Sequence, residues 1–126
     1  MSSFNIQVDK SSTDKIRQRI QSYEDRMTDM YFDMYDSWIN KAKPIFQKLD
    51  LSIEEKLILV ERAALSFLIN DISDRYQIKS KTNSQIVNSR GNTKALEEIV
   101  RLGDILKKIE IENRLLIKKF DAHFKK

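Results

Sequence analysis

Three aspartates near the start of the chain have the spacing of a candidate metal or acid–base site. Asp25, Asp29 and Asp33 recur every four residues, which would align their carboxylates on one face of a helix. Such a row could bind a divalent cation. Dinuclear carboxylate centres in helical bundles also need Glu-x-x-His pairs on other helices, and this chain has a single histidine, His123. We therefore expect a solvated acidic face, or one that meets lysines and arginines of a neighbouring subunit.

Other signatures of catalysis are also missing from the sequence. There is no Gly-rich phosphate loop of the Walker type and no paired catalytic constellation. The absence of cysteine excludes disulfides and thiolate-bound metals. The sequence predicts a protein that is not an enzyme, has no catalytic residues, and needs no metal or cofactor.

A basic segment between residues 75 and 94 suggests contact with phosphate groups. It contains no acidic residue, and Ser, Thr, Asn and Gln lie between its cations. The candidate DNA-binding residues are Arg75, Lys79, Lys81, Arg90 and Lys94. These residue types contact phosphate oxygens, although they specify no base sequence. A solvated flexible loop explains them equally well in a monomer, but in an oligomer the same charges would recur on every subunit and their fields would add.

Apolar residues near the C-terminus recur alternately three and four positions apart, which is typical of a seam between helices. The seam consists of Ile99, Leu102, Leu106, Ile109, Asn113, Leu116 and Phe120. Asn113 interrupts it with a polar side chain, which either fixes partner, register or oligomer state or is a tolerated polar residue at an exposed end of the bundle. The seam could pack within the chain, but apolar residues on its flanks favour an interface between subunits.

The elements that would position these residues are helices. Two glycines and one proline among 126 residues favour helix before any periodicity is considered. Residues 1–12 show no period and are expected to form a flexible N-terminal segment. Hydroxyl residues at 11–13 could cap a first helix over about 13–48, which Pro44 should bend or end.

Two further helices complete the expected domain, which spans residues 13–126. Ser52 and Glu55 have the spacing of a capping box and should begin a central helix over 53–77. A basic loop over 78–92 precedes a last helix over 93–124. The fold class is therefore all-α, an elongated bundle of three main helices.

Helix length adds an argument for assembly. The last helix alone would extend about 48 Å if its roughly 32 residues were straight. A compact chain of this size would be only about 36 Å across. The helices should therefore form an elongated bundle or project into other subunits, and we expect a homo-oligomer.

No apolar run approaches the roughly 20 residues needed to cross a bilayer. The first residues also lack a charged region followed by an apolar core. We expect a cytoplasmic protein without a membrane partner.

The stretch from Trp38 to Phe124 resembles the small terminase subunits of tailed bacteriophages. The resemblance lies in the layout: a helix through Ser37-Trp38-Ile39-Asn40, a helix opened by Leu51-Ser52-Ile53-Glu54-Glu55, a polar loop with Ser89-Arg90-Gly91-Asn92, and a long helix beginning Ala95-Leu96-Glu97-Glu98. It implies a non-enzymatic ring in the host cytoplasm that binds double-stranded viral DNA and regulates the large terminase.

One departure from this layout affects the expected mode of DNA binding. Many small terminase subunits carry an N-terminal helix-turn-helix domain, whereas residues 13–48 read here as a single helix. Backbone binding through the basic loop is therefore favoured over reading of a specific site.

A different class of function also fits the sequence. The first helix is acidic and rich in Met and Tyr, and it could dock on a protein partner. The alternative is a small helical adaptor or inhibitor with no nucleic-acid role.

Overall fold

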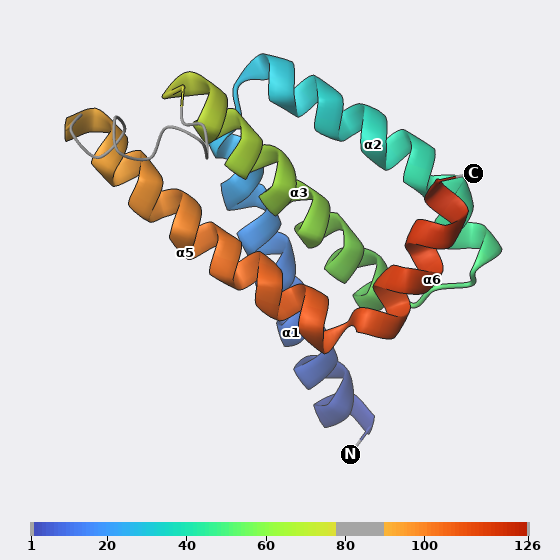
Figure 1. Ribbon diagram of the computed structural model, residues 1–126. Helices are drawn as coiled ribbons and strands as arrows, with labels where there is room; N and C mark the ends of the chain where they lie inside the picture. The colour runs from blue at the N-terminus through green and yellow to red at the C-terminus, as the bar shows by residue number, and fades with distance from the viewer. Residues whose placement is uncertain (1, 78–89, 126) are drawn as a thin grey trace.

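The computed structural model describes residues 2–77 and 90–125, with side chains described for 13–77 and 93–125. The described part is all-helical and contains no strand, which confirms the all-α class, although it holds five helices where three main helices were expected. It comprises α1 (Ser2–Arg26), α2 (Asp29–Lys48), α3 (Ile53–Arg75), α5 (Arg90–Glu112) and α6 (Arg114–Phe124) (Figure 1). The expected basic loop falls mostly on residues 78–89, outside the described residues.

Helix α3 is the centre of the fold. It packs against α1, α2 and α5, because apolar side chains cover most of its circumference. Leu65 and Leu68 are fully buried in one core cluster, and Leu59 is fully buried in a second. The predicted capping box is present, since the Glu55 N–H donates to Ser52 Oγ at 3.1 Å and the Ser52 N–H donates to Glu55 Oε1 at 2.9 Å. This central helix begins at the predicted residue and ends at Arg75, two residues before the predicted end.

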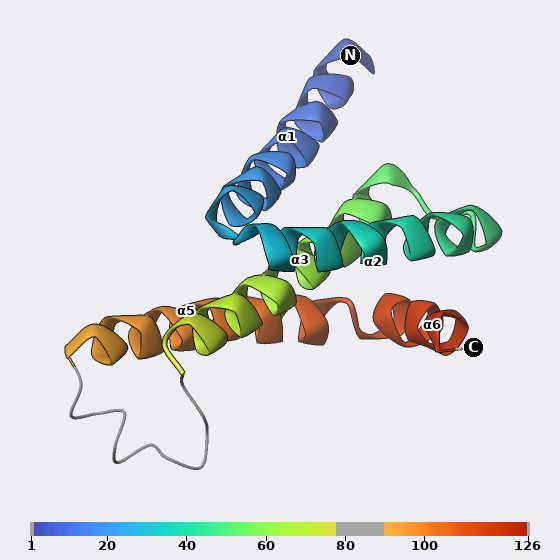
Figure 2. The ribbon, with the colours of Figure 1, turned by 90° about the horizontal axis from the view of Figure 1, so that it is seen from above.

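The expected first helix is instead two helices. α1 begins at Ser2, so its backbone includes most of the segment expected to be flexible, and it ends at Arg26. α2 begins at Asp29 after Thr28, which is extended with φ −69° and ψ 161°. The chain breaks here because the Thr28 N–H donates to the Asp71 carboxylate on α3 at 2.6 Å rather than to a helical carbonyl. Viewed from above, α1 points away from α2 (Figure 2).

Pro44 does not end α2, which continues to Lys48. A proline inside a helix removes the hydrogen bond to the carbonyl four residues earlier, here that of Asn40. Both Pro44 and Asn40 lie on the exposed side of α2, where water can satisfy that carbonyl.

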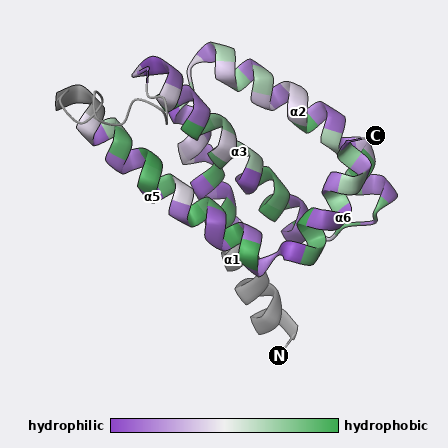
Figure 3. Cartoon of the chain, in the orientation of Figure 1, coloured by the Kyte–Doolittle hydropathy of each residue, from purple (hydrophilic) through white to green (hydrophobic). Residues whose placement is uncertain are grey.

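The expected last helix also divides, at Asn113. This residue has φ −123° and ψ 33°, outside the helical range, and its Nδ2 donates to the carbonyl of Ile109 at 2.9 Å. α6 therefore changes direction and packs against α2. Phe120 of α6 lies 5.7 Å, between ring centroids, from both Trp38 and Phe46 of α2. In Figure 3 hydrophobic and hydrophilic residues alternate along both α5 and α6, as expected for helices with one buried face.

Candidate nucleic-acid interface

The structure brings together the two predicted basic residues whose side chains it describes. Arg75 ends α3, and Lys94 lies near the start of α5. These helix ends lie at the same end of the molecule (Figure 1). Arg90 begins α5, but its side chain is outside the described ones, and Lys79 and Lys81 fall outside the described residues.

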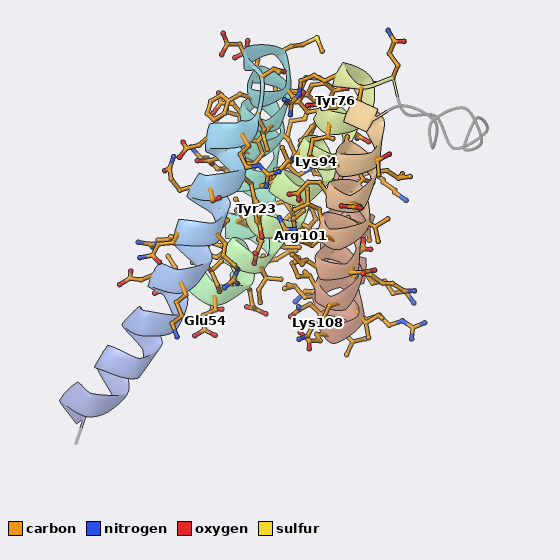
Figure 4. All side chains as sticks on the ribbon, turned by 90° about the vertical axis from the view of Figure 1, so that its left-hand side faces the viewer. Tyr23, Glu54, Tyr76, Lys94, Arg101 and Lys108 are labelled. Carbon is orange, nitrogen blue, oxygen red and sulfur yellow. The ribbon has the colours of Figure 1, made fainter. Side chains whose placement is uncertain are left out.

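Arg75 and Lys94 line one cavity of about 450 Å³ together with a third cation, Arg26. The remaining lining residues are Ile72, Tyr76, Ala95 and Glu98. Figure 4 shows Tyr76 and Lys94 at this end of the bundle. We call the surface formed by Arg26, Arg75 and Lys94 the basic end. It is composed of the last turns of α1 and α3 and the beginning of α5.

Arg26 could not be recognised from its local sequence. It is the only cation among five acidic residues between Tyr23 and Asp36, so its neighbours suggest an acidic surface. It reaches the basic end because α1 stops at this residue and packs on α3. The signal is therefore tertiary and not local.

Glu98 partly neutralises the basic end. Its Oε1 accepts hydrogen bonds from Arg26 and from Arg101, each at 2.6 Å. The hydrogen bond from Arg101, assisted by that from Arg26, lowers the pKa of Glu98 from 4.5 to about 2. Glu98 is therefore ionised at neutral pH and holds the two guanidinium groups in place.

Arg75 is anchored by the buried carboxylate of Asp71. Its Nε donates to Asp71 Oδ1 at 3.0 Å, and the Asp71 side chain is fully covered. The same carboxylate accepts the Thr28 N–H, so one residue fixes both Arg75 and the corner between α1 and α2. The Arg75 side chain remains 42% exposed.

Lys94 forms no ion pair with any residue in the described part of the chain, and it is exposed. The cavity therefore carries three cations against Glu98 on its lining and Asp71 behind it. Guanidinium groups recognise phosphate by paired N–H donors, and an ammonium group adds a point charge. This arrangement can hold an anionic group such as a phosphate.

The row of three aspartates expected on one helical face is not formed. The break at residues 27–28 leaves Asp25 on α1 and places Asp29 and Asp33 on α2. All three side chains are exposed. No group of His, Cys, Asp or Glu that could hold a metal ion occurs within residues described by the structure.

The predicted seam packs inside the chain. Leu102 and Phe120 are 0% and 1% exposed, respectively. Ile99, Leu106 and Ile109 pack partly buried against the cluster around Leu102, which also contains α1, α2 and α3 residues. Of the two arrangements considered for the seam, these side chains follow the one within the chain. The reason is the turn at Asn113, which allows α6 to fold back on α2 with Leu116 and Phe120 facing inward.

Other apolar residues remain exposed outside this seam. Ile111 and Leu115, on either side of Asn113, are 67% and 83% exposed. On α2, Met34 is 47% exposed and lines a second cavity of about 500 Å³. The other residues lining this cavity are Asp33, Ser37, Trp38, Lys41, Phe67 and Phe124. We call it the apolar cavity.

Comparison of the chain with family models, with curated proteins and with solved structures finds no match. The resemblance to small terminase subunits therefore rests on the order and character of the elements alone. Within the described residues, no helix is both long and apolar enough to cross a membrane.

Proposed function

We propose that the protein is a non-enzymatic DNA-binding component that holds the phosphate backbone with its basic end. The observation that carries this proposal is the convergence of Arg26, Arg75 and Lys94 on one cavity. Lys79 and Lys81 follow Arg75 closely in the sequence, and Arg90 shortly precedes Lys94.

The number of cations argues for binding as an assembly. Non-specific DNA binding strengthens with the number of phosphates neutralised, and the slope of log K against log salt is about −0.9 per phosphate. One protomer with about three contacts would bind weakly at physiological salt. A homo-oligomer that presents several basic ends to one duplex would bind through all of them. We propose such an oligomer, of the kind formed by small terminase subunits, with a large terminase as its protein partner.

Charge reversal tests this function. Changing Lys79, Lys81 and Lys94 together to Glu should abolish retention of duplex DNA in fluorescence anisotropy, and the wild-type protein should lose affinity steeply across a salt series. Arg75 is left unchanged in this variant, because a carboxylate beside the buried Asp71 would destabilise the fold.

The matched control reverses three exposed lysines elsewhere, Lys15, Lys43 and Lys48. It changes the net charge by the same amount, so it separates a local site from the overall charge. The control should retain most of the binding. Equal loss in both variants, or a wild-type protein indifferent to DNA, would exclude a DNA site at the basic end.

The alternative function, a helical adaptor or inhibitor, is favoured by the apolar cavity beside an acidic helix. Between residues 29 and 40, α2 carries three aspartates and no lysine or arginine. Under this alternative the wild-type protein would not retain DNA, and the reversal of Lys79, Lys81 and Lys94 would leave binding to the protein partner unaffected.

A further inference from the structure

The apolar cavity is a partly aromatic depression lined by residues of α2, α3 and α6. Trp38 and Phe124 lie 5.8 Å apart between ring centroids, and Phe124 stacks on the buried Phe120 at 5.4 Å. Met34 and Phe67 complete its apolar lining. Aromatic rings fixed in this way offer apolar contact area without a large loss of side-chain entropy on binding.

The rim of this cavity is acidic. Asp33 is part of the lining, and Asp29 and Asp36 are exposed nearby on the same helix. Lys41 is the only cation among the lining residues. A partner that fills the cavity should therefore present apolar side chains surrounded by positive charge.

The chain itself carries a surface of this kind. Ile111 and Leu115 project at the junction of α5 and α6 and are the most exposed large apolar residues among the described side chains. Between residues 107 and 119 the sequence has five lysines and arginines against two glutamates. Of these glutamates, Glu110 is paired with Arg62. We call this surface the basic ridge.

We infer that the basic ridge of one copy of this chain docks in the apolar cavity of a second copy. Ile111 and Leu115 would cover the face formed by Met34, Trp38 and Phe124, while the lysines and arginines of the ridge would face Asp29, Asp33 and Asp36. Met34, Ile111, Leu115 and the charged residues of both surfaces are exposed in the single chain, whereas Trp38 and Phe124 are partly buried and supply the floor of the cavity.

The cavity and the ridge are different surfaces of each protomer, so the contact is heterologous. A heterologous contact leaves one free cavity and one free ridge on every dimer, and it continues until a ring closes or a filament grows. This inference deepens the proposed assembly, on which it rests, by naming the two surfaces that meet. It involves none of the cations of the basic end.

The test is the mass of the protein in solution without DNA, which makes its outcome independent of the DNA-binding experiment. By light scattering over a dilution series, the wild-type chain of 14.9 kDa should form species larger than a dimer. Met34→Lys should abolish assembly by placing a cation in the cavity. The double change Ile111→Gln and Leu115→Gln should abolish it from the other side.

Mixing the two variants provides the decisive measurement. The Met34→Lys chain keeps an intact ridge, and the Ile111→Gln, Leu115→Gln chain keeps an intact cavity. Their equimolar mixture should form a dimer with one copy of each and grow no further. Because all three positions are exposed, the circular dichroism spectrum of each variant should match that of the wild type.

The control is Ile53→Glu, which removes an exposed apolar residue that belongs to neither surface. This variant should keep the wild-type mass. A wild-type chain that remains at 14.9 kDa at every concentration would overturn the inference. A mixture that stays monomeric, or a ridge variant that assembles normally, would also overturn it.

Discussion

Replacement of Leu102 by Ala should unfold the protein more easily without changing its assembly. Leu102 is fully buried in the cluster formed with residues of α1, α2 and α3. Removing three carbons of such a side chain costs about 2–5 kcal/mol through lost transfer energy and the cavity that remains. Domains of this size have a free energy of unfolding of only about 5–15 kcal/mol. The variant should therefore lose a large share of its stability.

Urea unfolding followed by circular dichroism measures this loss. With an m-value of about 2 kcal/mol/M, a loss of about 3 kcal/mol lowers the midpoint by about 1.5 M. The control is Val100→Ala on α5, whose side chain is 57% exposed, belongs to neither the apolar cavity nor the basic ridge, and whose replacement should change stability by no more than about 0.5 kcal/mol.

Light scattering on the same samples completes the test. The Leu102→Ala chain should keep the wild-type mass under native conditions, since its side chain contacts only its own chain. The reasoning is refuted if the variant dissociates while its urea midpoint stays at the wild-type value. That result would place Leu102 between subunits.

Two further predictions concern single hydrogen-bonded groups. Ser52→Ala should lower the free energy of unfolding by about 0.5–2 kcal/mol in urea titrations, because the capping box at the start of α3 loses its acceptor. The pKa of Glu98 is lowered from 4.5 to about 2, so its ion pairs stabilise the fold fully above pH 4.5 and this contribution is lost as the pH falls towards 2. Urea titrations across that range should show a smaller dependence on pH in Glu98→Gln than in the wild type.

Local signals in the sequence identified the central helix correctly. Ser52 and Glu55 are three residues apart, and their hydrogen bonds satisfy backbone groups within one turn, so the sequence alone contains both partners. The apolar residues that follow, including Ala64 and Leu68, are numerous enough to cover several sides of a helix, and both are fully buried. Such features do not depend on distant parts of the chain.

The break between α1 and α2 depends on a distant residue. The apolar period continues from Tyr23 through Met27 to Tyr31, and all three side chains are buried, so periodicity gives no sign of an interruption. The Thr28 N–H leaves the helical pattern because Asp71, 43 positions later, accepts it. The candidate site shows the same limit, since Arg26 joins Arg75 and Lys94 only through this corner.

The seam at the C-terminus was recognised from its spacing, but spacing does not specify which chain supplies the facing helix. A 3-4 repeat is satisfied equally by a helix of the same molecule and by one from another subunit. The argument from length favoured another subunit because a straight helix over residues 93–124 would extend about 48 Å. The turn at Asn113 removes that premise, since α5 and α6 extend only about 34 and 16 Å. Asn113 therefore decides how the seam packs, because it ends α5 and directs Phe120 towards Trp38 and Phe46. The same turn leaves Ile111 and Leu115 exposed, which is why the proposed contact between copies uses these two residues.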